Sequence, residues 1–157
     1  MVSVSRPSSA LTSHLDDICG KLTMLTADST IIASMPNIHD QHSKIAEKYS
    51  ELVAAMQDDA KAAARPKMFA NMIAFVAMHF AVENAYMKSL SYPLTTRHVE
   101  QHASFIRNVN ALSDEVRQGM LSVEELVLFI GHWLVGHLLL ADTQFEEFQA
   151  SMSAEEM

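Results

Sequence analysis

The stretch "HFAVENAYMKSLSYPLTTRHVEQHASF", residues 79–105, decides how this chain folds. His79 precedes Glu83 by four residues, and His98 precedes His102 by the same interval. Residues four apart lie on one face of a helix, about 6 Å from each other along its axis. The rest of each helical face is largely apolar. Imidazoles and a carboxylate therefore occupy positions that hydrophobic core side chains would normally take.

Hydrophobic periodicity around this stretch predicts long amphipathic helices. "SYPLTT" separates two of them with Pro93 at the turn, and Gly119 is placed to end the second. A further helix opens at "SVEE", where Ser122 and Glu125 form a capping box. The predicted helices span about 39–60, 66–90, 95–118 and the residues after 122. Four helices with short connectors predict an all-α fold, an up-down-up-down four-helix bundle.

The composition agrees with one helical domain and excludes several functions. The chain has 157 residues, 49% hydrophobic residues, and only four Gly and four Pro. Its formal net charge of −8 argues against binding to nucleic acid or to an anionic membrane. The most apolar run, residues 126–141, contains two histidines and is shorter than the roughly 20 residues of a membrane span.

The N-terminal region predicts a cytoplasmic protein with an added helix. The single Cys19 fits a reducing compartment, and the first residues lack the apolar core of a secretory signal. A short amphipathic helix is expected at about 9–26, with Leu11, Leu15, Ile18, Leu22 and Leu25 on one face. It could dock on the bundle, mediate homo-oligomer formation or stay mobile. We therefore divide the chain into an extension (1–34), a bundle (35–150) and a tail (151–157).

Histidines on the apolar stripes indicate a metal site. Five histidines lie on the apolar stripe of their own helix: His42, His79, His98, His102 and His137. A buried imidazole without a partner costs a few kcal/mol, and a metal ion would satisfy all five together. With Glu83 and Asp142 they exceed the four ligands of structural zinc and suit two adjacent transition-metal ions. Asp142 follows His137 by five residues, an offset of about 140° on an α-helix, so it fits the stripe least well.

Four sequence blocks together resemble the bacterial hemerythrins. They are "NIHDQH", "HFAVENAYM", "HVEQH" and "HWLVGHLLLAD", and the likeness covers about residues 35–148. The resemblance implies two non-haem iron ions per chain. One would be held by His98, His102 and His137, and the other by His42 and His79. Glu83 and Asp142 would bridge them together with an oxo or hydroxo group. Dioxygen would bind reversibly at the open position of the second iron, without catalysis.

Some residues in these blocks depart from the pattern of the family. Asn84 stands where a second glutamate is usual, and His39 where an acidic residue is usual, which should alter hydrogen bonds around the site. Trp133 and Ile45 are expected either to form a wall of the site or to serve as ordinary core packing. The sequence leaves three alternatives to reversible oxygen binding. One is a sensor of oxygen, nitric oxide or redox state that signals through the N-terminal helix. The others are a peroxidase-like enzyme and a bundle without metal.

Overall fold

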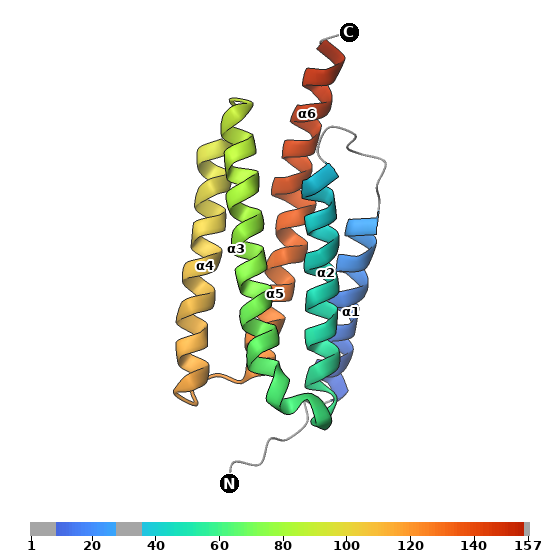
Figure 1. Cartoon of the computed structure of the whole chain (residues 1–157), viewed down its shortest axis with the longest axis vertical. Helices are drawn as coiled ribbons and strands as arrows, with labels where there is room; N and C mark the ends of the chain where they lie inside the picture. Colours follow the sequence, from blue (N-terminus) through green and yellow to red (C-terminus); the bar gives the residue numbers. More distant parts are fainter. Residues whose placement is uncertain (1–8, 28–35, 156–157) are drawn as a thin grey trace.

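The computed structural model describes residues 9–27 and 36–155, and every element in these ranges is a helix. Figure 1 shows the helices standing side by side. The all-α prediction is confirmed. The elements are α1 (Ser9–Ala27), α2 (Pro36–Met56), the 3₁₀ helix η2 (Asp59–Ala64), α3 (Arg65–Ser89), α4 (Thr95–Arg117), α5 (Val123–His137), the π-helix η3 (Leu138–Asp142) and α6 (Thr143–Glu155).

Helices α2 to α5 run alternately down and up, as in an antiparallel bundle (Figure 1). Helices α5, η3 and α6 follow each other without a gap, so the last arm of the bundle is one long helix that reaches Glu155. This helix thus runs on past residue 150. Helix α1 packs against both α2 and α5.

The predicted helix ends are confirmed where residues close in the sequence determine them. The Ser122 hydroxyl accepts a hydrogen bond from the Glu125 amide at 3.1 Å and caps α5. Gly119, with φ of 75°, follows the end of α4 in the left-handed conformation. The predicted helix 39–60 ends early, at Met56. There the Asp58 carboxylate accepts from the Ala60 amide and starts the tighter η2.

Two apolar clusters fill the bundle, one on each side of a polar layer. The larger contains Tyr49, Phe105 and Ile130 and extends to α1. The smaller consists of Ile38, Met87, Tyr92 and Phe145. In α2, in α3 and in the last arm, the predicted metal-site residues lie between a residue of one cluster and a residue of the other. His98 and His102 of α4 lie between Tyr92, which precedes the helix, and Phe105. The polar layer is therefore sealed at both ends by hydrophobic packing.

Helix α1 docks through the leucine stripe expected from the sequence. Leu15 and Leu22 are fully buried and Ile18 is 2% exposed. Close approach depends on Gly131 of α5, because a Cβ there would lie 2.6 Å from Ile18 Cγ2 and 2.3 Å from the Tyr49 hydroxyl oxygen. The structure thus places α1 on the bundle. Formation of a homo-oligomer through it stays a prediction.

Two helical stretches, Asp59–Ser89 and Val123–Met152, are apolar and long enough to cross a membrane by length and composition alone. The first contains the buried His79 and Glu83, and the second contains the buried His137 and Asp142. Buried polar side chains of this kind, turned toward the other helices of a bundle, are typical of a core helix. The expectation of a protein without a membrane span stays a prediction.

Candidate metal centre

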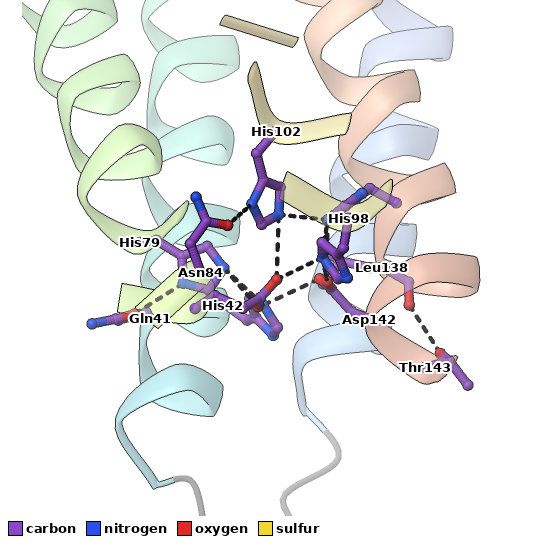
Figure 2. A network of polar contacts seen from close by, with 11 residues as sticks. Gln41, His42, His79, Asn84, His98, His102, Leu138, Asp142 and Thr143 are labelled. Carbon is purple, nitrogen blue, oxygen red and sulfur yellow. Dashed lines mark hydrogen bonds and ion pairs between the residues drawn. The ribbon is translucent and has the colours of Figure 1, made fainter. Parts of the chain in front are cut away.

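All seven residues singled out in the sequence converge in the polar layer between the two apolar clusters. Figure 2 shows how the labelled members of this group lie: His42, His79, His98, His102 and Asp142. None of the seven is more than 9% exposed. They come from α2, α3, α4 and the last arm: His42; His79 and Glu83; His98 and His102; His137 and Asp142. Their ligand atoms form two groups that share Glu83.

The five imidazoles present their Nε2 atoms to one another in two sets. In the first set, His137 Nε2 lies 3.0 Å from the Nε2 atoms of both His98 and His102. In the second set, the Nε2 atoms of His42 and His79 are 3.1 Å apart. Two neighbouring ligands of an octahedral ion with bonds of about 2.1 Å lie about 3.0 Å apart. The spacing of both sets therefore fits ligands of one ion each.

Glu83 lies between the two sets and offers one oxygen to each. Its Oε1 is 2.7 Å from His98 Nε2 and 3.3 Å from His102 Nε2. Its Oε2 is 3.3 Å from His79 Nε2 and 3.6 Å from His42 Nε2. This arrangement suits a carboxylate that bridges two ions.

The two carboxylate oxygens of Asp142 are also divided between the two histidine sets. Its Oδ1 lies 3.1 Å from the Nε2 atoms of both His98 and His137, and its Oδ2 lies 3.3 Å from His42 Nε2. The expected offset of 140° between His137 and Asp142 was wrong, because it assumed an ideal α-helix and residues 138–142 form a π-helix. A π turn joins residues five apart, and it returns Asp142 to the face that carries His137.

Two side-chain amides orient the rings from outside (Figure 2). His79 Nδ1 donates to Gln41 Oε1 at 2.9 Å, and His102 Nδ1 donates to Asn84 Oδ1 at 2.7 Å. An amide oxygen can only accept, so the proton of each neutral ring sits on Nδ1 and the lone pair of Nε2 points into the cluster. The sequence drew attention to Asn84 but missed Gln41, whose position next to His42 was the available clue.

Burial and the two carboxylates shift the pKa values of the metal-free cluster in opposite directions. Burial disfavours a charged His42 or His98, but hydrogen bonds to Asp142 and Glu83 outweigh it and raise the two pKa values to about 10 and about 9. Burial dominates at His102 and lowers its pKa to about 4. Burial also opposes charge on Glu83 and Asp142, yet the facing histidines hold both pKa values below their usual range. Protonated His42 and His98 then face the two carboxylates.

Without a metal ion, some polar atoms of the cluster lack a well-aligned hydrogen bond. Neutral His102 directs its Nε2 lone pair toward Glu83 Oε1, 3.3 Å away, so two acceptors face each other. Among the described residues, Glu83 Oε1 and Asp142 Oδ1 are also buried without an aligned hydrogen-bond donor. Unsatisfied buried acceptors are costly, and a metal ion removes that cost. The residues present therefore fit a pair of bound metal ions.

Aromatic and aliphatic side chains surround the cluster. The Trp133 ring stacks on His137, with centroids 4.4 Å apart and planes at 13°, and Ile45 lines a cavity beside His42. Phe80, which sequence reasoning did not select, stacks on His102 with centroids 3.9 Å apart. The exposed His14 and His132 face each other and are not members of either metal-binding group. The side chain of His39 lies outside the described residues.

Comparison with known proteins agrees with this site. The family described as the Hemerythrin HHE cation binding domain matches residues 31–148. The chain belongs to the hemerythrin family. It is 28% identical over 101 residues to bacteriohemerythrins of Pseudomonas aeruginosa strain LESB58 and Stenotrophomonas maltophilia strain R551-3. That alignment covers 64% of this chain and 65% of each relative, just under two thirds of their length. No solved structure matches the chain.

Membership of the hemerythrin family confirms the resemblance seen in the sequence and makes this a metal-binding protein of an oxygen-related family. The family match begins after α1, which ends at Ala27. The docked N-terminal helix is therefore an addition to the matched hemerythrin domain.

Proposed function

We propose that this protein binds dioxygen reversibly at two non-haem iron ions and serves as an oxygen carrier, store or scavenger. The observation that carries the proposal is the division of donors between the two histidine sets. The His98, His102 and His137 set also receives one oxygen from each carboxylate, which makes five protein donors. The His42 and His79 set receives the other two carboxylate oxygens, which makes four.

This difference gives the two positions different roles. With one shared oxo or hydroxo group, an ion in the first set would have six ligands and an ion in the second only five. An ion that keeps an open position can accept an external ligand, whereas a closed one cannot. Two irons held in this way would supply reversible electron transfer to dioxygen. The side chains of the second set, His42 and His79, would face the bound molecule.

The protein surroundings favour binding over further chemistry. Five neutral imidazoles and two carboxylates bring little net negative charge, which helps to retain ferrous iron. The apolar clusters on both sides limit the access of water and protons. The cluster as we propose it has no catalytic residue. A bound metal ion would also replace the protons on His42 and His98, so iron loading should release protons.

The direct test is to load the purified protein with ferrous iron without oxygen and then admit air. We expect about two irons per chain by elemental analysis. A visible absorption band should appear with air and disappear when oxygen is removed. His137→Ala should abolish the band. His14→Ala removes an exposed histidine and should leave it unchanged. Two bound irons without a reversible band would contradict the proposal.

A sensor is the second candidate, because α1 lies outside the matched domain and yet packs against two of its helices. In that case ligand binding would shift α1 and expose a surface to a partner. Cys19, half-buried where α1 meets the core, reports this movement through its reaction with a thiol reagent. A labelling rate that is the same with and without dioxygen would argue for the carrier.

A further inference from the structure

A small cavity lies against the metal centre, where residues of both histidine sets line it. Both histidines of the second set, His42 and His79, line it, and so do His137 of the first set and Asp142. Apolar side chains, Phe80 and Leu134 among them, complete the wall. It offers about 10 Å³ to the centre of a water-sized molecule, which is close to the minimum that one such molecule needs. The cavity is therefore matched to a very small ligand next to the residues of the more open position.

One wall of this cavity comes from the N-terminal helix. Leu22 of α1 lines it, although all of its other lining residues belong to the matched region 31–148. Leu22 has no exposed surface, while Lys21 and Met24 of the same helix are exposed. Helix α1 thus has solvent on one face and the cavity on the other. Its removal would open the metal centre to water at this point.

We propose that Leu22 is the side chain that sets the size of the ligand admitted to the open metal position and keeps water away from it. The inference rests on the proposed dioxygen function of the cluster. A leucine at close packing beside a cavity of this size hinders large ligands more than small ones. The same apolar wall withholds the water and protons that would convert a reversible complex into oxidised iron. The added helix thereby gives the hemerythrin domain a ligand filter.

Several contacts fix Leu22 in this place. Ile18, one turn before Leu22, packs against the Gly131 backbone, and Leu15 is fully buried one turn further back. The Thr26 hydroxyl donates to the Leu22 carbonyl at 2.8 Å and is buried. A side chain held from both directions along its helix is well suited to act as a rigid wall.

The first test uses the iron-loaded protein and azide, a linear anion larger than dioxygen. Truncation by Leu22→Ala should raise the rate of azide binding to the oxidised protein by about tenfold and speed the loss of the oxygenated form comparably. Leu22→Val should give a smaller change in the same direction. Met24→Ala shortens an exposed side chain on the same helix and should leave both rates within about twofold of the wild type.

The second test needs no iron. Crystals of metal-free Leu22→Ala protein under xenon pressure should show a xenon atom between α1 and the rings of His42 and His79, since an enlarged apolar cavity takes up xenon. The wild type and Met24→Ala should show none there. Absence of xenon from that position in Leu22→Ala would overturn the assignment of Leu22 as the wall.

Further measurements separate this proposal from the function it rests on. If the wild type lacks two irons or a reversible band, the dioxygen proposal fails, and the xenon experiment still decides whether Leu22 closes the cavity. If the wild type behaves as proposed and azide binds both Leu22 variants at the wild-type rate, the ligand filter is refuted. Cys19 labelling shows whether α1 stays docked. If Leu22→Ala loosens α1, the comparison is made with Leu22→Val.

Discussion

Asp142 Oδ1 lies 3.1 Å from His137 Nε2, although the two residues are five positions apart in one continuous helix. The π turn that brings them together is closed by Thr143, whose hydroxyl donates to the Leu138 carbonyl oxygen at 2.9 Å (Figure 2). A widened turn leaves backbone carbonyls without their usual amide partners, and this side chain satisfies one of them. The geometry of the metal centre therefore depends on a local departure from the α-helix.

Replacement of Thr143 by valine keeps the shape of the side chain and removes the hydroxyl. We expect the free energy of unfolding to fall by about 1 kcal/mol, because the half-buried Leu138 carbonyl loses its partner. Urea denaturation of the metal-free protein measures this. Ser151→Ala removes a comparable bond, to the Phe148 carbonyl, at an exposed site and should cost less than half as much. Equal losses in the two variants would contradict this role of Thr143.

Asn84 controls the orientation and basicity of His102. Asn84→Ala should weaken iron binding by about 10- to 100-fold, because the His102 ring loses its outer hydrogen bond. Asn84→Asp should restore the affinity and lower the reduction potential, since a carboxylate makes the imidazole a stronger donor. Competition with a chelator and a redox titration measure the two quantities. Asn110→Ala, on the exposed face of α4, is the control. An unchanged potential in Asn84→Asp would count against this prediction.

Two glycines of α5 offer a matched pair. Gly131→Ala should lower the free energy of unfolding by about 1–3 kcal/mol, because its Cβ would collide with Tyr49 and Ile18. Gly136→Ala has no heavy atom within 4 Å of the new Cβ and should instead gain up to about 1 kcal/mol from helix propensity. Denaturant titrations provide both values. A stabilised Gly131→Ala protein would mean that α1 does not approach α5 as closely as described.

Removal of one ligand should distinguish the two metal positions. His79→Ala removes one of two histidines in its set, whereas the other set keeps its three histidines and both carboxylates. We expect about one iron per chain instead of two, and no reversible band in air. Iron analysis after gel filtration measures the stoichiometry. Two irons retained by His79→Ala would contradict the assignment of His79.

The stability of the metal-free protein should be greatest near pH 6.5. The folded-state pKa values of His42, about 10, and His98, about 9, exceed the ordinary 6.5. Their stabilisation is thus complete below pH 6.5 and is lost as the pH rises through 9 to 10. The pKa of His102, about 4, lies below 6.5, and the pKa values of Glu83 and Asp142 lie below their usual range. These three contributions are lost as the pH falls.

Urea midpoints of metal-free protein between pH 4 and 10 test this profile, and iron-loaded protein serves as the comparison. Bound metal replaces the protons of the cluster, so the loss at high pH should be much smaller in the loaded protein. A metal-free midpoint that keeps rising from pH 7 to 10 would contradict the raised pKa values of His42 and His98.

Much of the fold and the membership of the cluster follow from local sequence patterns. Histidines and carboxylates on apolar stripes mark the polar layer, because a buried polar side chain must find a partner. The turn at Pro93, the glycine after α4 and the Ser122 cap act within a few residues, so their effects are readable without the rest of the chain.

The tertiary structure decided what depends on residues distant in the sequence. The π turn before Thr143 departs from ideal helical periodicity, and so the angle of Asp142 was not predictable from a count of residues. Likewise, the pairing of Gln41 with His79 and the place of Leu22 in the cavity wall arise only when separate helices pack. The sequence by itself determined which side chains must be buried. Packing of helices against one another determined which atoms those side chains face.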